Sequence, residues 1–591
     1  MNLWDLLSAR AVDRPDAPAL RFAGASPSFS HRGLLDAAEA VAAFLAGGRG
    51  RAEAEPGMER REGPGAEAGG APGAGPGVGP GDRVVLIAPN RPETVLAYLA
   101  VLRLGAVAVP VNPAFRAPEL TRILADAAPR LAIVGEEAAA TLPEVTPEAR
   151  ESLEAVLRLE ELPGVAPERA TPGRSGPERT EEPASPGAGP GLPPPPDGPD
   201  PALLVYTSGT TGRSKGAVLT HDNLLATVSA LLAAWAWTPE DVLLLTLPLF
   251  HVHGLVVGLF TALAAGATVE LRERFDAAGA ARELAEDRAR GPAPTHPGRG
   301  RARPLHGPRG TGPEKSGPTV FFGVPTVYVR LLAALRDVPD RRGLDRVRLF
   351  ASGSAPLAPE TFHAFREATG HEILERYGMS ETGMNLSNQY AGPRRPGTVG
   401  VPLPGVSIRI VDPEDPAGVE VQPGGDGELL VAGSNVFTGY WRNPEASAAA
   451  FVTDASGRRW FRTGDLARRD PETGYVTLLG RRHELVIRGG ENVYPREVEE
   501  VLEALPGVRE AAVAGRAHPE WGEVPVAWVV AEDGGTPLEG GAPDPDALLA
   551  ACRERLAPFK VPAEVRFVPA LPRNALGKVQ KHRLGEAAGG V

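Results

Sequence analysis

Short apolar runs alternate with amphipathic stretches along the first part of the chain. Continuously apolar runs, typical of strands buried on both faces of a sheet, occupy residues 84–87, 106–111 and 131–134. Apolar positions at helical spacing recur in residues 34–45, 93–104 and 118–127. Strands that alternate with helices in this way predict βαβ units and a largely parallel sheet.

The pattern changes after residue 400. Short strands separated by Gly and Pro turns are expected at residues 408–411, 428–431 and 475–479. From residue 495 the predicted order is helix, strand, strand, helix, strand, at residues 495–504, 508–514, 525–531, 545–556 and 564–569. The predicted fold class is therefore α/β, with a large N-terminal domain (1–480) that combines βαβ sheets with a β-rich part. Residues 481–591 are expected to form a small α+β C-terminal domain.

Three segments show neither the helical nor the strand periodicity of apolar residues. About half of the positions in residues 48–81, 163–201 and 291–318 are Gly or Pro, and little in them could pack. They hold much of the unusual content of 71 Gly and 62 Pro in this chain of 591 residues, of which 42% are hydrophobic. We predict that all three are flexible surface insertions, and that removal of residues 50–79 leaves the activity nearly intact.

Composition narrows the function classes. The net charge of −12 argues against a general binder of nucleic acids. A single cysteine, Cys552, fits a reducing compartment, and the first residues lack the apolar core of a secretion signal, so a cytoplasmic location is expected. Residues 242–269 carry no charge, but Pro248 and His251 interrupt them. This predicts a buried strand, a loop and a core helix rather than a membrane span.

A loop rich in Gly and hydroxyl groups follows the predicted strand 202–205. Its candidate residues are Thr207, Ser208, Gly209, Thr210, Thr211, Gly212 and Lys215. Glycines let the backbone approach a polyanion closely, hydroxyls offer donors, and lysine adds a point charge, so we predict a phosphate-binding loop. It is not a Walker A motif, because Ser214 stands where that motif has glycine. Lysine is rare in this chain, occurring only at Lys215, Lys315, Lys560, Lys578 and Lys581, which supports a specific need for it where it is kept.

Six motifs together resemble the signature of the adenylate-forming superfamily, which includes acyl-CoA synthetases, luciferases and peptide-synthetase adenylation domains. The motifs are residues 206–216, 375–382, 440–442, 463–466, 480–481 and 572–578. The resemblance covers the chain outside the three insertions and implies the adenylate-forming fold. It also implies a reaction in two steps. A carboxylate attacks the α-phosphate of ATP to give an acyl-adenylate and pyrophosphate, and a thiol then displaces AMP.

The same resemblance implies roles for individual residues. Lys578 would approach the α-phosphate and carboxylate oxygens, and Glu381 with Thr210 would hold Mg²⁺, which prefers oxygen ligands. Asp465 would accept hydrogen bonds from the ribose hydroxyls while Tyr377 stacks on adenine. Further nucleotide contacts are implied for Gly353, Ser354, Ala355, Gly378, Met379, Ser380 and Arg481, and pantetheine contacts of CoA for Gly489 and Gly490.

A hinge is implied at Gly480 and Arg481, about which a mobile C-terminal domain would rotate between the two steps. Family members usually carry Asp or Lys two places after the hinge arginine, whereas this chain has His483. Because of this difference, the resemblance does not imply the pH dependence of the rotation, whereas it still implies the chemistry. We predict that His483→Asp changes the thioester step more than adenylation, and equal effects on both would refute this.

Residues 248–255 are more specific than the superfamily signature, because they are similar to the corresponding segment of the malonyl-CoA synthetases. Residues 375–385 and 400–406 share this similarity. A dicarboxylate needs a cation or a set of donors for its second carboxylate, since burying that charge unpaired would cost on the order of several kcal/mol. The candidates for the acid site are His251, His253, Arg274, Ser352 and Met384, with His251 also expected among the catalytic residues beside Lys578 and Glu381. An ordinary surface arginine at 274 and a core histidine at 253 are equally open.

The sequence thus predicts a Mg²⁺- and ATP-dependent ligase that makes malonyl-CoA or methylmalonyl-CoA from the free acid. Its partners would be a small carboxylic acid, ATP and CoA, without nucleic acid, in a monomer or a homodimer. Two other functions stay open. One is an acyl-CoA synthetase for a medium-chain or aryl monocarboxylic acid, and the other is a non-catalytic nucleotide-binding homologue.

Overall fold

The computed structural model describes most of the chain outside the three Gly- and Pro-rich segments. The described residues are 2–22, 28–47, 75–163, 192–207, 215–286, 317–413, 415, 418–488, 491–518, 521–532, 543–556, 558–574 and 577–587. Most of the three predicted insertions therefore lies outside the described residues, as do residues 208–214, Gly489 and Gly490, and the side chain of His483.

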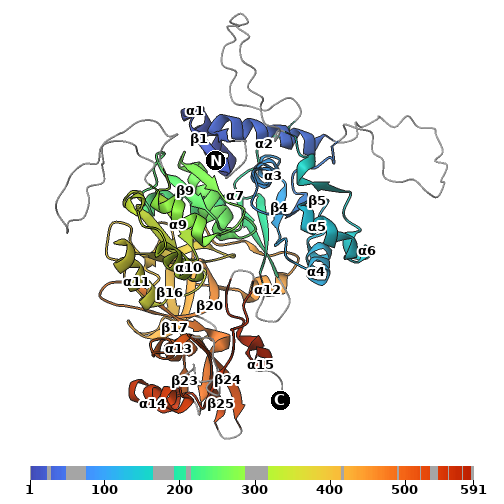
Figure 1. Cartoon of the computed structure of the whole chain (residues 1–591). Coiled ribbons are helices and arrows are strands. Elements are labelled where there is room, and N and C mark those ends of the chain that lie inside the picture. The colour runs from blue at the N-terminus through green and yellow to red at the C-terminus, as the bar shows by residue number, and fades with distance from the viewer. Residues whose placement is uncertain are drawn as a thin grey trace, which may run out of the picture.

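A seven-stranded sheet is built from the predicted βαβ units (Figure 1). Its order is β18–β8–β7–β4–β3–β5–β6, with β3 to β7 parallel and the β7–β8 hairpin and β18 antiparallel. The strands are β3 (Arg83–Ile87), β4 (Val107–Pro110), β5 (Leu131–Val134), β6 (Ala155–Arg158), β7 (Pro201–Thr207), β8 (Lys215–Thr220) and β18 (Gly439–Tyr440).

A second sheet of nine strands runs in the order β15–β14–β13–β12–β11–β9–β10–β1–β2. Its inner strands from β13 to β1 are parallel, and antiparallel strands close both ends. The strands are β1 (Pro18–Phe22), β2 (Phe29–Ser30), β9 (Val242–Leu245), β10 (Thr268–Leu271), β11 (Val320–Gly323), β12 (Leu349–Ser352), β13 (Leu374–Met379), β14 (Gly383–Ser387) and β15 (Val401–Pro402).

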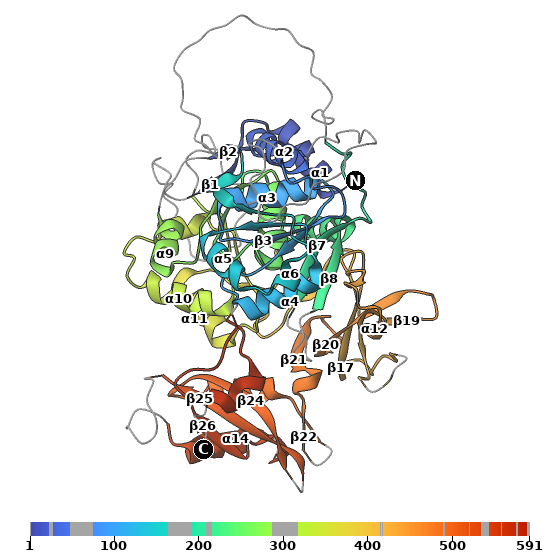
Figure 2. The ribbon, with the colours of Figure 1, turned by 90° about the vertical axis from the view of Figure 1, so that its right-hand side faces the viewer.

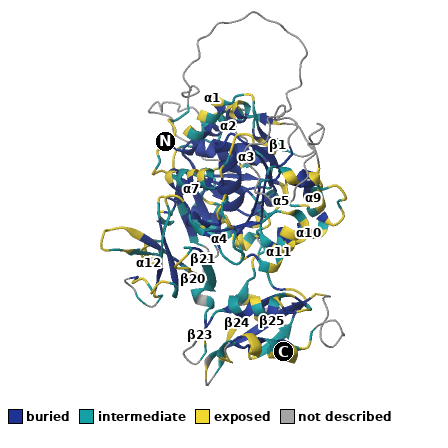
Figure 3. Cartoon of the chain, turned by 90° about the vertical axis from the view of Figure 1, so that its left-hand side faces the viewer, coloured by how far each residue is buried: buried dark blue, intermediate teal, exposed yellow. Residues whose placement is uncertain are grey.

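Helices cover both faces of each sheet. Successive side chains of the central strands point to opposite faces and therefore enter different cores. Val84 of β3 packs into the core between the sheets, whereas its neighbour Val85 packs outward. The shared core contains α1 (Leu3–Asp13), α2 (His31–Ala46), α3 (Pro92–Arg103), α7 (His221–Ala234) and α8 (Thr261–Ala264). The outer layers are α4 (Ala117–Ala127), α5 (Glu136–Thr141) and α6 (Pro147–Arg150) on the seven-stranded sheet, and α9 (Ala277–Ala285), α10 (Pro325–Leu335) and α11 (Pro359–Thr369) on the nine-stranded sheet. Figure 3 shows how buried residues concentrate in this layered body.

The β-rich part follows the nine-stranded sheet along the chain. It contains β16 (Ser407–Val411), β17 (Asp426–Ala432), α12 (Pro444–Ala449), β19 (Phe451–Thr453), β20 (Arg459–Arg469) and β21 (Val476–Arg481). The C-terminal module then gathers at one end of the molecule (Figure 2). Its elements are β22 (Val486–Arg488), β23 (Glu491–Val493), α13 (Pro495–Glu503), β24 (Val508–His518), β25 (Gly522–Ala531), α14 (Pro545–Arg555), β26 (Glu564–Phe567) and α15 (Leu584–Ala587).

The ends of two predicted insertions are packed against the body, which corrects their boundaries. Val78 is buried and donates its backbone N–H to the Leu45 carbonyl at 2.8 Å. The Pro196 carbonyl accepts a 2.6 Å hydrogen bond from the buried Asn2 amide. Residues 75–81 and 192–201 therefore belong to the folded body, because Gly and Pro there still bury surface and satisfy hydrogen bonds.

The long uncharged stretch 242–269 folds inside the layered body, as predicted. It forms β9, a π-helix (His253–Phe260), α8 and the first part of β10. Within the described residues, every helix is too short or too polar to cross a bilayer.

Candidate active site

The predicted phosphate-binding loop joins β7 to β8. Thr207 and Lys215 are opposite each other in this hairpin and mark the two sides of the loop. The loop residues Ser208, Gly209, Thr210, Thr211 and Gly212 lie outside the described residues, so their predicted contacts remain predictions. The hairpin nevertheless fixes where the loop leaves and re-enters the sheet, at the same end of β7 as the other candidate residues described below.

Glu381 is a buried carboxylate beside this hairpin. Its Oε1 accepts hydrogen bonds from the Thr207 hydroxyl at 3.4 Å and from the Tyr440 hydroxyl at 3.3 Å. Burial raises the pKa of Glu381, so its charge is costly without a further cation. Lys215 places its ammonium 5.2 Å from the centre of the Tyr440 ring. Within the described residues no cluster of three or more His, Cys, Asp or Glu is suited to a metal. A single carboxylate such as Glu381 fits Mg²⁺, which is commonly bound by one or two carboxylates together with substrate phosphates.

Asp465 and Arg481 form an ion pair where β20 meets β21. Arg481 Nε lies 2.7 Å from Asp465 Oδ1, and the Tyr377 hydroxyl donates a 2.5 Å hydrogen bond to Oδ2 of the same carboxylate. Burial, and then the Asp465 charge, raise the pKa of Tyr377, which stays a donor at neutral pH. A second Arg481 nitrogen donates to the Thr463 carbonyl at 3.1 Å. The residues predicted to bind ribose and adenine therefore come together from two sheets.

Lys578 reaches this pair from the C-terminal module. Its backbone N–H donates to Asn574 Oδ1 at 2.9 Å, which fixes the turn that carries it. The residue is open to solvent, yet nearby protein atoms partly desolvate its ammonium and lower its pKa, and Arg481 adds to this effect. Asp465 and Glu484 act in the opposite direction. The turn that carries Lys578 also lies against the N-terminal part, because a Cβ atom on Gly577 would lie 3.5 Å from the Thr326 hydroxyl oxygen of α10.

A second group of polar side chains lies beyond β12 and at the start of the π-helix. The Nδ1 atom of His253 is 3.2 Å from the Ser354 hydroxyl, and Ser354 has a left-handed backbone with φ of +70°. Such strain in a non-glycine residue is typical of functional loops. Burial lowers the pKa of His251 to about 4 and that of His253 well below its usual value, so both rings are neutral at pH 7.

Arg376 is the residue of this group that sequence reasoning missed. Its side chain is buried in β13, with the residue only 4% exposed. A Cβ atom on Gly353 would lie 2.6 Å from the Arg376 guanidinium carbon, so glycine makes room for it. Burial lowers the pKa of Arg376 to about 9, and its charge helps to lower the pKa of His253. The signal that could have revealed it is an arginine inside a run of strand residues that are otherwise expected to be buried.

Several buried atoms in this region have no hydrogen-bond partner within the part of the chain that the structure describes. They are Arg376 Nε and Nη2, His251 Nε2, His253 Nε2 and the Ser352 hydroxyl. Buried polar atoms of this kind are normally paired, so those near Arg376 and the two histidines leave room for a polar ligand. Ser352 is in register with Glu375 rather than with Arg376, so its hydroxyl lies on the other face of the sheet. We call Arg376, His251 and His253 the acid cluster, and the sequence prediction of Ser352 for this site is not supported by its place in the sheet. Arg274, by contrast, is exposed in the bend that follows β10.

Met384 and the π-helix surround this region with apolar atoms. Met384 is buried in β14, opposite Gly378 in β13. Every residue of the π-helix from His253 to Phe260 is buried. A Cβ atom on Gly254 would lie 2.2 Å from the Pro248 carbonyl oxygen, so only glycine allows the helix to start so close to that loop.

The adenylate-forming enzymes share this arrangement. It consists of two layered sheets, a β-rich part and a C-terminal module that carries a lysine. Residues 75–290 and 312–441 match the model of the AMP-binding enzyme family, and residues 497–578 match that of the AMP-binding enzyme C-terminal domain. The chain therefore belongs to the AMP-binding enzyme family. This confirms the resemblance and the fold class predicted from the sequence.

Individual relatives differ in the acids that their names state. The chain is 38% identical to the mitochondrial malonate–CoA ligase of Mus musculus, over 65% of the chain and 64% of the relative, so it spans less than two thirds of that protein. It is 34% identical to the sulfoacetate–CoA ligase of Cupriavidus necator, over 99% of the chain and 97% of the relative. The crystal structure of ATP-bound MatB from Rhodopseudomonas palustris superposes with a TM-score of 0.77 at 34% identity, over 99% of both chains.

Proposed function

We propose that the chain is an ATP-dependent acid–CoA ligase that activates malonate, or methylmalonate, as an acyl-adenylate and transfers the acyl group to CoA. The observation that carries the choice of acid is the guanidinium of Arg376, which is buried with two nitrogens unpaired among the described residues. A monocarboxylic acid would leave this cation without a counter-ion, whereas the second carboxylate of malonate would pair with it. We therefore assign the second carboxylate to Arg376 rather than to the exposed Arg274.

The neutral histidines of the acid cluster suit the same substrate. Because burial lowers their pKa values, His251 and His253 each present one N–H donor and one acceptor at pH 7. Their unpaired Nε2 atoms would supply further hydrogen bonds to a small anion. The names of two relatives agree with this chemistry, since malonate and sulfoacetate both carry a second anionic group beside the carboxylate.

In the first step, a carboxylate oxygen of the acid attacks the α-phosphorus of ATP and pyrophosphate leaves. Two anions must approach each other, so fixed cations and donors provide most of the catalysis. Lys578 would supply a positive charge at this point, and Asp465 would hold the ribose hydroxyls through its oriented carboxylate. Glu381 would hold Mg²⁺, which neutralises phosphate charge when it is bound.

In the second step, the CoA thiolate attacks the acyl carbonyl carbon and AMP leaves. Lys578 has no task in this step, so the C-terminal module can turn away once the acyl-adenylate has formed. The predicted pantetheine contacts, Gly489 and Gly490, would then serve the thiol. The close approach of Gly577, beside Lys578, to Thr326 of α10 supports the first of these two arrangements for the molecule described above.

AMP release with CoA and a panel of acids tests the proposal. Malonate and methylmalonate should exceed octanoate and benzoate, and Arg376→Met should lower kcat/KM for malonate by about a hundredfold or more, because it removes the partner of a buried charge. Arg274→Met is the matched control and should stay within about threefold. Preference for octanoate or benzoate would overturn the choice of acid. ATP binding without AMP release from any acid would favour the non-catalytic alternative.

A further inference from the structure

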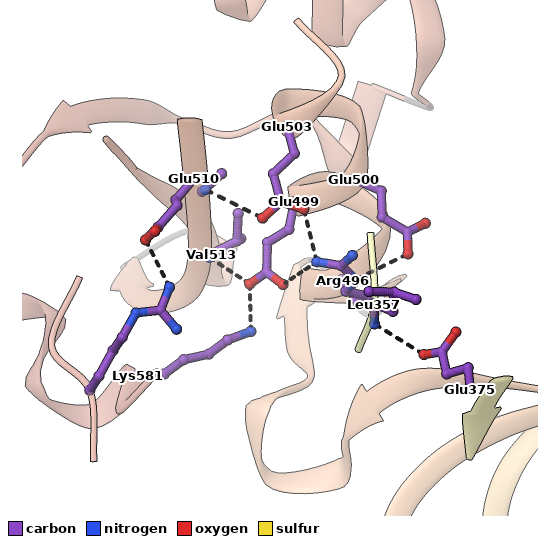
Figure 4. Close-up of polar contacts among 11 residues, drawn as sticks. Leu357, Glu375, Arg496, Glu499, Glu500, Glu503, Glu510, Val513 and Lys581 are labelled. Carbon is purple, nitrogen blue, oxygen red and sulfur yellow. Dashed lines mark hydrogen bonds and ion pairs between the residues drawn. The ribbon is translucent and has the colours of Figure 1, made fainter. Parts of the chain in front are cut away.

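Lys581 contacts two carboxylates at once, one in α13 and one at the junction with the β-rich part. Its ammonium lies 2.6 Å from Glu499 Oε1 and 3.3 Å from Glu484 Oε2. The three side chains are 16%, 7% and 21% exposed, in the order Lys581, Glu499, Glu484, so the triad is largely shielded from solvent. Figure 4 shows Lys581 and Arg496 approaching Glu499 from opposite sides.

The three residues belong to different structural parts. Glu484 ends a short 3-10 helix (Arg482–Glu484) that directly follows β21, where the β-rich part passes into the C-terminal module. Glu499 belongs to α13 and is itself fixed, because its Oε1 also accepts the Val513 N–H at 2.8 Å. Lys581 comes three residues after Lys578, at the start of another 3-10 helix (Lys581–Arg583). The triad therefore connects the segment of Lys578 to the junction between the two parts of the chain.

Apolar packing holds this segment on the C-terminal sheet, and Lys581 adds a direct ionic contact to the junction. Leu571 and Leu584, on either side of Lys578, pack with Trp528 against one face of the C-terminal sheet. The backbone of the turn is closed by the Asn574 N–H, which donates to the Lys578 carbonyl at 2.9 Å. These contacts set the shape of the turn, and the ion triad sets its place relative to Glu484, only three residues beyond Arg481.

We propose that Lys581 is a positioning residue for the adenylation step, which places the Lys578 turn against the junction so that Lys578 faces Asp465 and Arg481. The inference rests on the proposed ligase function and adds a residue to it. Exposed ion pairs contribute little, but removal of Lys581 would leave the nearly buried Glu499 with the more distant Arg496, whose Nη1 lies 4.0 Å from Oε2 and which also pairs with Glu500 and Glu503. A small displacement of a catalytic group is enough to slow a reaction by about a hundredfold.

Separate measurement of the two half-reactions distinguishes a positioning role of Lys581 from an effect on stability alone. Pyrophosphate release from ATP and malonate reports adenylation, and AMP release after CoA is added to enzyme preloaded with ATP and malonate reports the thioester step. Lys581→Met should slow adenylation by about tenfold or more and change the CoA-triggered step by less than about threefold. Lys581→Arg, which keeps the charge, should retain adenylation within about threefold.

Lys560 offers a matched control, because its partner carboxylate lies on α13, the helix that carries Glu499. Its ammonium lies 2.7 Å from both carboxylate oxygens of Glu497 in α13, on a different segment from Lys578. Lys560→Met should leave both half-reactions within about threefold of the original rates. Equal losses in both half-reactions for Lys581→Met, or an equal loss of adenylation in Lys560→Met, would overturn the proposal.

Amide hydrogen exchange over residues 571–584 provides a readout that does not need turnover. Lys581→Met should speed exchange in this segment, while Lys581→Arg and Lys560→Met should not. Faster exchange in a protein that activates no acid would support the positioning contact and refute only the ligase function, whereas unchanged exchange would refute the contact itself. If Lys581→Met does not fold, Glu484→Gln cuts the link to the junction and leaves the pair with Glu499, and it should give the same selective loss of adenylation.

Discussion

The hydroxyl of Tyr377 donates a 2.5 Å hydrogen bond to Asp465, although the two residues lie 88 positions apart in the chain. Tyr377 belongs to β13 of the nine-stranded sheet and Asp465 to β20 of the β-rich part. Arg481 holds the other oxygen of the same carboxylate. Both oxygens of Asp465 are thus oriented before any nucleotide arrives, which is how a rigid recognition site is built.

Tyr377→Phe should weaken both the fold and the proposed nucleotide site. A hydrogen bond to a charged acceptor contributes about 1.5–3 kcal/mol, so the free energy of unfolding should fall by that amount. The KM for ATP should rise several-fold, because one oxygen of Asp465 loses its orientation. Tyr475→Phe is the control, since that hydroxyl donates to the neutral Pro393 carbonyl at 2.6 Å. An equal rise in the KM for ATP in both variants would contradict the role given to Tyr377.

Glu381→Gln should separate the charge of this residue from its packing. The variant keeps the shape of the side chain but cannot neutralise Mg²⁺, so adenylation should fall by about a hundredfold and respond poorly to added Mg²⁺. Stability at neutral pH should stay equal or rise, because burial raises the pKa of Glu381 and makes its charge costly. Denaturant unfolding and Mg²⁺ titration of pyrophosphate release measure the two effects. Loss of stability with normal Mg²⁺ dependence would refute this assignment.

Glu375 should make the protein less stable as the pH rises. Its Oε1 accepts the Leu357 N–H at 3.0 Å, and burial raises its pKa from 4.5 to about 8, with Arg496 lowering it and Glu500 raising it slightly. The folded state therefore binds more protons than the unfolded state between these values, and stability is lost as the pH climbs through that window. Glu375→Gln imitates the neutral form. Its advantage over the original protein should grow from about pH 5 to about pH 8 in denaturant unfolding, and parallel pH profiles would rule out this linkage.

Deletion of residues 50–74 should leave stability and AMP release within about twofold, because loop length has a weak effect on stability. The body brings the ends of this segment together, since a Cβ atom on Gly47 would lie 3.7 Å from the backbone nitrogen of Gly75. Deletion of residues 50–79 should instead cost about 1.5–3 kcal/mol, because it removes the buried side chain of Val78. Thermal unfolding compares the two variants. Equal midpoints would mean that Val78 does not anchor the segment.

Local patterns in the sequence predicted most of the elements closely. The helix expected at 118–127 is α4 (Ala117–Ala127), and the strand expected at 131–134 is β5 (Leu131–Val134). Such elements are found because their period reflects which face is buried. The predicted ends of the insertions were less accurate, since Val78 is packed within a segment that is rich in Gly and Pro. Composition identifies a segment that lacks a core of its own, but it cannot show which residues pack against another part of the chain.

The candidate site was predicted only where a motif had a known counterpart. Asp465, Tyr377 and Arg481 were expected at one nucleotide site, and the structure brings them into direct contact. Their pairing connects strands of different sheets, which no local period reveals. Arg376 was overlooked because its position next to Tyr377 suggested only the nucleotide motif. Its significance depends on burial and on the space left by Gly353, and both are properties of the folded chain.

The π-helix beside the acid cluster has a consequence for how this site can evolve. Its wider turns, with hydrogen bonds from residue i to i+5, accommodate one residue more than an ordinary helix of the same length. Loss of a single codon between His253 and Phe260 would therefore be absorbed by a return to α-helix, which keeps the later side chains near their present directions. A length change of one residue is thus accommodated within this segment, a kind of variation that point substitutions do not sample.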